Sequence, residues 1–344
     1  MSKGRALMLV SAWVDDRLRA DVAAGLRPTP EYLVLESEHG VDLLDWSRVP
    51  GARPQRSGWQ ATLHAATALP RLRGYETVFS DGEHVGVPLA LAIRGVGIKT
   101  RHLVLGHRLS TPSKSRLLRR AHPGMTRILV HSPAQLAHAL SLGMAPSKLD
   151  LIPYYADHAY WRPMDVDEEP LIVSAGREHR DYATLARACE KLDVKVFVAS
   201  GSVHSPGADV SLPASWPSNF SWGFADYVRL RTLYARAQVV VVPVMPTDFQ
   251  AGVTTILEAM SMARPVVVSA TEGQRDVVED GVTGVMVPPG DADALRRAIE
   301  RLLADPAERA RLGANARAAV EERFSLDVYA CSLEGHLEEL AAAG

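Results

Sequence analysis

The stretch Asp248-Phe-Gln-Ala-Gly-Val-Thr-Thr-Ile-Leu-Glu-Ala-Met260 follows the β-branched run 239–242 and leads into a helical pattern from about Thr254. A strand, a polar loop and a helix in this order are typical of a parallel sheet wound with helices. Gly252 stands directly before the helix, where a glycine lets the backbone approach a ligand closely. The first N–H groups of a helix lack intrahelical partners and attract a diphosphate. The stretch therefore predicts an α/β fold with a phosphate-binding site.

Glu258 stands about one turn into this helix, beside the predicted phosphate site. A carboxylate accepts two hydrogen bonds and therefore suits a vicinal diol such as a ribose. A glutamate that merely faces solvent is the alternative that the stretch alone leaves open.

The same alternation of β-branched runs and helical patterns extends along the whole chain. The predicted strands are 6–10, 32–35, 77–80, 101–105, 127–131, 149–153, 171–174, 194–199, 239–242, 265–269 and 284–287. The predicted helices include 87–94, 133–142, 182–192, 227–237, 255–263 and 292–305. We therefore predict two doubly wound, Rossmann-like α/β domains that face each other across a cleft, where such sheets bind ligands.

The predicted boundary between the domains lies near 156–170, where two prolines and a cluster of acidic residues interrupt the alternation. We predict an N-terminal, acceptor-side domain at 1–156 and a C-terminal, nucleotide-sugar-binding domain at 157–325. A last helix at 326–344 follows, and its pattern leaves open whether it packs back on the N-terminal domain.

Composition limits the class of protein. The chain has 344 residues, 47% of them hydrophobic and 23% charged, which is typical of a globular protein. Its formal net charge of −2 argues against a nucleic-acid binder. The apolar run 6–10 is too short for a signal peptide, and the two cysteines are far apart. We expect a cytoplasmic protein without a cysteine-bound metal.

The positive charge is concentrated in one segment, because residues 85–149 contain no Asp or Glu but ten Lys or Arg side chains. Within it, residues 113–121 form a basic amphipathic pattern. Three interpretations stay open: peripheral contact with anionic lipid at the inner membrane face, the wall of a site for an anionic acceptor, or a solvated face.

A larger set of residues resembles a known family. Gln250 and Glu258, followed by Arg264-Pro-Val-Val-Val268, are similar to the Glu-x7-Glu motif of the retaining, family-4 glycosyltransferases with the GT-B fold. The resemblance is dense in the second half and continues at 152–157, 161–163, 272–273, 276–278, 280–281, 283–284 and 287–291. It implies transfer of a sugar, with retention, from a nucleotide-diphosphate donor to an acceptor that the sequence does not identify.

The resemblance implies roles for residues of the second half. Glu258 matches the glutamate that holds the donor ribose, and a four-residue loop meets the donor phosphate and sugar: Gly252, Val253, Thr254 and Thr255. Arg177 matches a diphosphate-binding arginine, and Arg180 replaces a lysine. Two fixed cations compensate the charge of the leaving diphosphate, so we expect neither a metal nor another cofactor. The alternative is that both arginines form surface salt bridges with Glu178 or Asp181.

Two residues depart from the family pattern. Gln250 stands where the family carries a glutamate that contacts the donor sugar, which indicates either an unusual sugar or a weakened enzyme. Ala263 stands where a glycine is common, and we expect this change to affect packing alone.

The first half offers weaker candidates. His107 follows the predicted strand 101–105, where the family often carries a histidine that faces the transferred sugar, and His84 follows another strand. Asp81 and Glu83 are the acids of the same turn and are candidates to orient or deprotonate an acceptor hydroxyl. For all four, an ordinary loop residue is the alternative.

The aromatic segment Phe220-Ser-Trp-Gly-Phe224 corresponds to a loop that passes over the nucleotide base in the family. Its aromatic rings, Phe224 included, either stack on a base or pack in the core.

A retaining glycosyltransferase is the function predicted from these residues. A nucleotide-sugar epimerase or sugar phosphorylase of the same architecture is a second candidate. A catalytically silent partner or binding subunit is a third, which Gln250 motivates.

Overall fold

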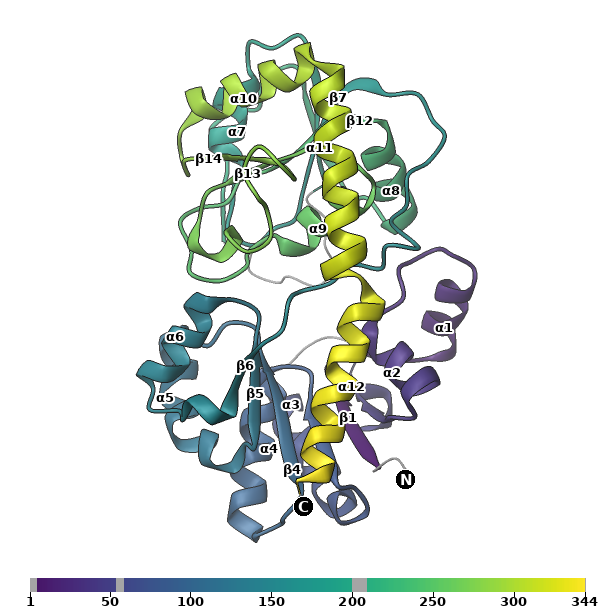
Figure 1. The fold of residues 1–344 in the computed structure, drawn as a ribbon, viewed down its shortest axis with the longest axis vertical. Coiled ribbons are helices and arrows are strands. Elements are labelled where there is room, and N and C mark those ends of the chain that lie inside the picture. The colour runs from purple at the N-terminus through teal and green to yellow at the C-terminus, as the bar shows by residue number, and fades with distance from the viewer. Residues whose placement is uncertain (1–4, 54–58, 200–208, 344) are drawn as a thin grey trace. The chain divides into compact units, whose positions relative to one another are not determined.

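The computed structural model describes residues 5–53, 59–199 and 209–343, which form two compact units (Figure 1). The first unit comprises the chain up to Ala24, Thr29–Pro153 and the chain from Asp327. The second unit comprises Gly25–Pro28 and Tyr154–Leu326. Residues 154–156, assigned from the sequence to the N-terminal domain, thus belong to the second unit, as do Gly25–Pro28.

The first unit is built on a six-stranded parallel sheet in the order β2-β1-β3-β4-β5-β6. Its strands are β1 (Ala6–Val10), β2 (Asp42–Asp45), β3 (Thr77–Ser80), β4 (Arg101–Gly106), β5 (Arg127–Val130) and β6 (Leu149–Leu151). The α-helices that precede Pro153 in this unit are α1 (Asp16–Ala23), α2 (Glu31–His39), α3 (Gln60–Ala68), α4 (Glu83–Val96), α5 (Pro112–Ala121) and α6 (Pro133–Ser141).

The predicted strand 32–35 is wrong, because these residues lie in helix α2. All four are buried, and a short apolar run of this kind does not distinguish a buried strand from a buried helix. The flanking residues decide for a helix: Pro30 precedes the first turn, and Gly40 ends the helix with a φ of 67°. The strand of this region is β2, a few residues later.

The second unit contains a six-stranded parallel sheet in the order β11-β9-β7-β12-β13-β14. Its strands are β7 (Glu169–Ala175), β9 (Lys195–Ala199), β11 (Phe220–Gly223), β12 (Ala237–Val242), β13 (Val266–Ser269) and β14 (Val285–Val287); a small pair, β8 (Arg180–Asp181) and β10 (Val210–Ser211), lies beside it. The strand order reverses between β7 and β12. Open α/β sheets bind ligands at the carboxyl ends of the strands at such a point.

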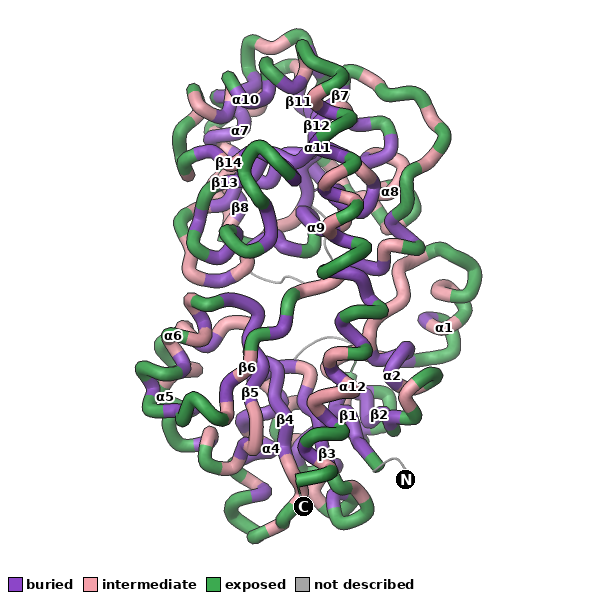
Figure 2. Tube along the Cα trace, viewed as in Figure 1, coloured by how far each residue is buried: buried purple, intermediate pink, exposed green. Residues whose placement is uncertain are grey.

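Alternate residues of these strands supply two buried layers, one on each face of the sheet. The strand β12 is buried along most of its length (Figure 2). One layer contains Val173, Val240 and Val242 with residues of α8, α9 and α11, and the other contains Ile172 and Val241 with residues of α7 and α10. The helices are α7 (Tyr182–Cys189), α8 (Tyr227–Arg236), α9 (Val253–Ser261), α10 (Ala292–Ala304) and α11 (Pro306–Ala319). Burial on both faces explains why the strands are continuous Val-rich runs.

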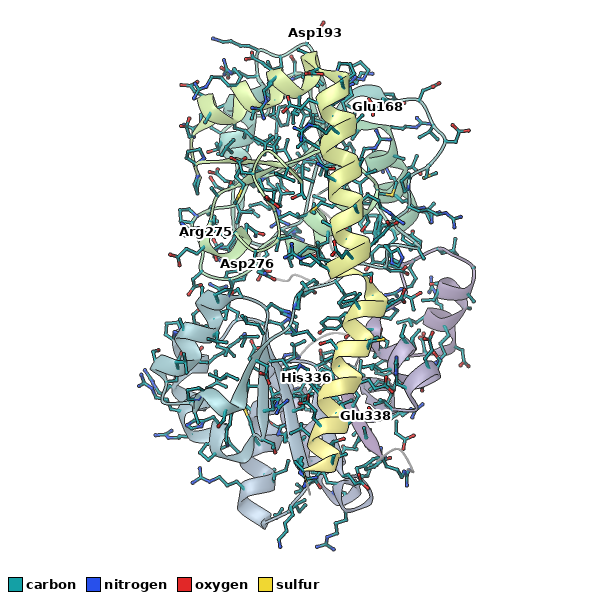
Figure 3. The ribbon with its side chains drawn as sticks, viewed as in Figure 1. Glu168, Asp193, Arg275, Asp276, His336 and Glu338 are labelled. Carbon is teal, nitrogen blue, oxygen red and sulfur yellow. The ribbon has the colours of Figure 1, made fainter. Side chains whose placement is uncertain are left out.

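The last helix, α12 (Leu326–Ala342), packs on the first unit from Asp327 onward. Arg127 of β5 pairs with Glu339 at 2.6 Å, and His39 pairs with Glu334 at 2.7 Å. His336, labelled in Figure 3, lies on the same helix, and its Nδ1 is 3.2 Å from the Arg127 guanidinium. Among the described residues, no helix is both long and apolar enough to cross a membrane.

Ala263 has a backbone consequence that the sequence-based expectation of a packing effect alone missed. It follows α9 with a φ of 53°, in the left-handed region where a side chain is strained. The glycine that is common here would adopt this conformation without that strain.

Candidate functional site

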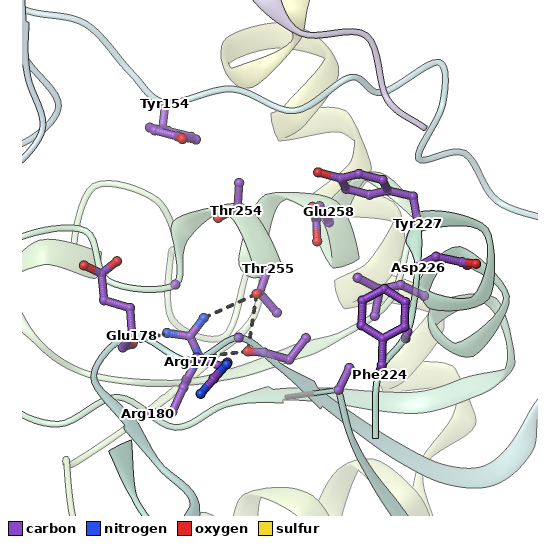
Figure 4. Close-up of a pocket in the computed structure, with 16 residues that line it drawn as sticks. Tyr154, Arg177, Glu178, Arg180, Phe224, Asp226, Tyr227, Thr254, Thr255 and Glu258 are labelled. Carbon is purple, nitrogen blue, oxygen red and sulfur yellow. Dashed lines mark hydrogen bonds between the residues drawn. The ribbon is translucent and has the colours of Figure 1, made fainter. Parts of the chain in front are cut away.

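A cavity of about 470 Å³ opens at the reversal point of the second sheet (Figure 4). Its wall comes from the end of β7 and the segment that follows it, the last residue of β9, the segment after β11, and the starts of α8 and α9. The lining residues are Tyr154, Ala175, Gly176, Arg177, Glu178, Arg180, Ala199, Phe224, Ala225, Asp226, Tyr227, Leu230, Gly252, Thr254, Thr255 and Glu258. The structure thus gathers most of the predicted donor-binding residues around one cavity.

The N-terminus of α9 meets this cavity through backbone atoms. Gly252 is the N-cap residue with a φ of 84°, and the Val253 N–H donates to the Gln250 carbonyl at 3.3 Å. The N–H groups of Thr254 and Thr255 donate to no described residue. Because they point out of the first helical turn, they provide uncompensated donors and the positive end of the helix dipole.

Glu258 lies one turn further along α9 and is partly exposed to the cavity. The Tyr234 hydroxyl donates a hydrogen bond to its Oε2 at 3.3 Å. Burial raises the pKa of Glu258 to about 8, and the Tyr234 hydrogen bond and the Arg180 charge oppose this shift. A carboxylate in such surroundings gains from hydroxyl donors that satisfy its charge.

Arg180 is almost fully buried, and its guanidinium is largely bound to the protein. It donates to the carbonyls of Ala175 at 2.8 Å and Glu178 at 2.7 Å, and to the Thr255 hydroxyl at 3.4 Å. A Cβ on Gly252 would come within 2.8 Å of the guanidinium, so only a glycine leaves room there. Arg180 therefore ties the loop after β7 to the start of α9, and it forms none of the predicted salt bridges.

Arg177 is the more accessible of the two arginines. It is partly exposed, lines the cavity, and forms no ion pair or hydrogen bond with the described residues. Glu178 is exposed and Asp181 caps α7, so neither neutralises Arg177. The structure thus leaves one arginine charge available at the cavity wall.

The aromatic segment 220–224 divides between the two interpretations. Phe220 is buried in the core, and Trp222 stacks on Trp216 with 5.2 Å between ring centroids. Phe224 lines the cavity and is 56% exposed, which leaves one face of its ring available. Most of the segment is the edge strand β11 rather than the predicted loop.

Gln250 precedes the cavity wall without belonging to its described part. Its amide oxygen Oε1 is buried and accepts no hydrogen bond from the described residues. An unpartnered buried oxygen is costly, so a ligand donor would satisfy it favourably.

The candidates of the first unit also lie together, but they bind one another. The backbone N–H of His107 donates to Glu83 Oε2 at 3.0 Å, and the ring Nε2 of His107 donates to the Asp81 carbonyl at 2.9 Å. Lys114 forms an ion pair with Glu83. Burial opposes ionisation of Glu83, but His107 and Lys114 hold its pKa below the usual range. A Cβ on Gly82 would contact the ring of His84 as well as that of His107.

Asp81 differs from Glu83 in its electrostatics. Burial raises the pKa of Asp81 to about 6, although the Ser11 backbone N–H donates to its Oδ2. Its other oxygen, Oδ1, is buried without a hydrogen bond among the described residues. Asp81 is thus the acid of this turn that is able to exchange a proton near neutral pH.

Tyr227, Tyr234 and Tyr154 are site residues that sequence reasoning missed. Tyr227 and Tyr154 line the cavity, and Tyr234 contacts Glu258. The two tyrosines of α8 are seven residues apart and so share one helix face, a pattern that also describes an ordinary core face. The spacing of the two tyrosines is therefore present in the sequence but does not distinguish a binding site from an ordinary core face.

Known proteins similar to this chain point to one family. Residues 170–305 match the family model described as "Glycosyl transferases group 1". A D-inositol 3-phosphate glycosyltransferase of Xylanimonas cellulosilytica is 36% identical over 48% of this chain and 41% of its own length. An α-D-kanosaminyltransferase of Streptomyces kanamyceticus is 32% identical over 34% of this chain and 30% of its own length. The chain thus matches less than half of each of these relatives.

Solved structures with the same fold cover nearly the whole chain. A sucrose-phosphate synthase of Thermosynechococcus elongatus aligns with a TM-score of 0.75 at 20% identity, over 99% of this chain and all of its own. HepE of Anabaena, in complex with UDP and glucose, aligns with a TM-score of 0.70 at 16% identity, over 97% of this chain and 99% of its own. Residues 170–305 therefore belong to the group 1 glycosyl transferase domain family, and the chain as a whole shares the fold of these solved structures.

Proposed function

We propose that this protein transfers a sugar, with retention, from a nucleotide-diphosphate donor held in the cavity of the second unit. The observation that carries the proposal is the pairing of Glu258 with the open N-terminus of α9 around one cavity. Glu258 would hold the ribose hydroxyls, and the Thr254 and Thr255 N–H groups would hold the diphosphate. Phe224, exposed at the opposite wall, would stack on the base.

Arg177 would stabilise the leaving diphosphate. In the proposed reaction the acceptor oxygen bonds to the anomeric carbon on the face from which the diphosphate departs. The bond from that carbon to the diphosphate oxygen breaks, and the acceptor proton passes to the leaving phosphate. A positioned cation is worth most where this negative charge develops. Because Arg177 supplies that cation, we expect transfer to continue in excess EDTA; loss of activity that magnesium restores would contradict this.

Gln250 would read the donor sugar. An amide accepts with its oxygen and donates with its nitrogen, whereas a carboxylate accepts twice. Gln250 therefore suits a donor with an acceptor group, such as an N-acetyl or keto group, or one that lacks a hydroxyl. We expect Gln250→Glu to shift kcat/KM toward plain hexose donors; an unchanged ranking across a donor panel would show that Gln250 does not contact the sugar.

Helix α5 would attach the protein to an anionic membrane surface at the cytoplasmic face. Arg116, Arg119 and Arg120 are exposed on it, and Leu117 between them is 47% exposed. Basic charge beside an exposed apolar side chain favours anionic lipid. Co-sedimentation with phosphatidylglycerol vesicles, weakened in Arg116→Glu/Arg119→Glu, is the expected result; equal binding by both forms would leave α5 a solvated face.

Two measurements test the catalytic proposal. In a thermal-shift screen of UDP, GDP, ADP and dTDP, at least one should raise the melting temperature, since a ligand of the native state stabilises it. The matching nucleotide sugar should then be hydrolysed slowly and transferred to an acceptor. Conversion of the donor to an epimer without acceptor would favour the epimerase, and binding without turnover would favour a silent subunit; the relatives favour neither.

A further inference from the structure

Tyr234 stands behind the cavity and is not part of its wall. It is completely buried on α8, with its ring against Trp161 at 5.7 Å between centroids. Its hydroxyl donates to Oε2 of Glu258 at 3.3 Å. Burial and the Glu258 charge raise the pKa of Tyr234 well above its usual value, so the phenol stays protonated and remains a donor.

The Tyr234 hydroxyl is the one hydrogen-bond donor to the Glu258 side chain within the described part of the chain. It occupies one carboxylate oxygen and leaves Oε1 for the cavity. A glutamate side chain has three rotatable torsions, and an untethered one loses conformational entropy when it binds a ligand. The phenol removes part of that cost before the ligand arrives.

A separate set of hydrogen bonds lies at the end of the cavity that we assign to the diphosphate. Thr255 Oγ1 accepts from Arg180 at 3.4 Å and donates to the Ala175 carbonyl at 3.5 Å (Figure 4). The Tyr234 hydroxyl instead donates to the Glu258 carboxylate. Glu258 and Arg180 are thus held by different hydrogen-bond partners.

We propose that Tyr234 is a positioning residue of the nucleotide site, whose hydroxyl aims the Glu258 carboxylate at the two ribose hydroxyls. This inference rests on the proposed function, because it assigns the ribose to Glu258. If this inference holds, Tyr234 affects binding of the ribose only, because its hydroxyl does not contact the diphosphate.

Titration calorimetry with Tyr234→Phe tests the proposal. The probes are the tightest binder among UDP, GDP and ADP, its 2′-deoxy form, and inorganic pyrophosphate. We expect the variant to bind the ribonucleotide about tenfold more weakly, the usual scale for a hydrogen bond to a charged group. The loss should shrink with the 2′-deoxy form and vanish with pyrophosphate. In the double variant with Glu258→Ala, removal of the phenol should cause no further loss.

A matched control is Tyr160→Phe. Tyr160 is also buried, packs on the same Trp161 at 4.9 Å between ring centroids, and donates its hydroxyl to the Leu26 carbonyl at 3.4 Å. The Tyr160→Phe variant should bind all three probes with the affinity of the wild type.

A second readout is the pH dependence of binding. The groups that interact electrostatically with Glu258 are Arg180 and the phenols of Tyr160, Tyr227 and Tyr234. We expect nucleotide affinity to rise with pH as Glu258 ionises, because the carboxylate is the form that accepts from both ribose hydroxyls. The Tyr234 hydrogen bond favours the ionised form, so in Tyr234→Phe this rise should occur at higher pH. Equal binding of the ribonucleotide by variant and wild type, or an equal loss for pyrophosphate, would overturn the positioning role. If the wild type binds none of UDP, GDP, ADP and dTDP, the proposed function itself fails.

Discussion

The polar clusters of the two units differ in whether their groups have partners within the protein. In the first, His107, Glu83 and Lys114 are bound to one another. In the second, Arg177 and the N–H groups of Thr254 and Thr255 have no partners among the described residues, and these three residues line a cavity of about 470 Å³.

This difference separates groups that stabilise the fold from groups that wait for a ligand. A closed cluster satisfies its own charges, so removing a member costs stability. An open cluster carries unsatisfied donors, whose removal costs binding or catalysis and leaves the fold intact. The donor site that we propose in the second unit therefore rests on groups without protein partners, whereas the acceptor-side candidates of the first unit already have such partners.

Arg177→Ala should show the largest effect on the open side. We expect kcat/KM to fall on the order of 10²–10³-fold, the scale for one positioned electrostatic donor, while the melting temperature stays unchanged. Steady-state kinetics and thermal melts measure the two quantities. Arg162→Ala, an exposed arginine outside the cavity, is the control. A fall of less than about tenfold would place Arg177 outside the diphosphate site.

Glu83→Gln alters the cluster of the first unit, and we expect it to lower stability, whereas Arg177→Ala lowers activity. It removes the charge that pairs with Lys114 and weakens the hydrogen bond from the His107 N–H. We expect the free energy of unfolding to drop by about 1.5–3 kcal/mol in denaturant titrations. Unchanged stability together with lost transfer would instead make Glu83 an acceptor-side residue and break the comparison.

Buried groups of the two units should contribute to the pH dependence of stability with opposite signs. Burial lowers the pKa of His64 to about 4 and that of His102 to about 3, both in the first unit. Their neutral forms stabilise the fold above pH 6.5, and this contribution is lost as the pH falls. Burial raises the pKa of Glu258 from 4.5 to about 8, so its contribution is present at low pH and is lost as the pH rises toward 8.

Thermal melts between pH 7.5 and 8.5 isolate the Glu258 contribution, because the histidines of the unfolded chain, with an ordinary pKa near 6.5, are then about nine-tenths neutral. We expect the melting temperature of the wild type to fall across this range, and Glu258→Gln to remove that fall. The same decline in both proteins would show that Glu258 is not the group responsible.

Ala263→Gly should show the smallest effect. Ala263 has a φ of 53° directly after α9, and a glycine there relieves left-handed strain. We expect a gain of about 1 kcal/mol in the free energy of unfolding, with unchanged nucleotide affinity. A loss of stability would show that the Ala263 methyl contributes packing that outweighs its backbone strain.

The sequence predicts most of the strands, because parallel strands buried on both faces are unbroken Val-rich runs such as 239–242. It predicts the start of α9 and the site of Glu258, because both depend on a few consecutive residues. It fails at 32–35, where a short apolar run is ambiguous between helix and strand.

Contacts between distant elements account for what the sequence does not predict. Tyr234 of α8 contacts Glu258 of α9, a residue that lies 24 positions later in the sequence. Arg180 and Arg177 read alike in sequence, yet only the fold turns Arg180 onto the Ala175 carbonyl and leaves Arg177 at the cavity. The backbone conformation of Ala263 likewise depends on how α9 ends.

The most direct test of the account is the affinity of a nucleoside diphosphate for wild type, Glu258→Ala and His107→Ala, measured by calorimetry. The central claim is that the second unit alone holds the nucleotide. We predict that Glu258→Ala binds at least about tenfold more weakly, having lost the hydrogen bonds of a charged group. We predict that His107→Ala, which alters the closed cluster of the first unit, binds as tightly as wild type. Wild-type affinity in Glu258→Ala, or an equal loss in His107→Ala, would contradict the claim.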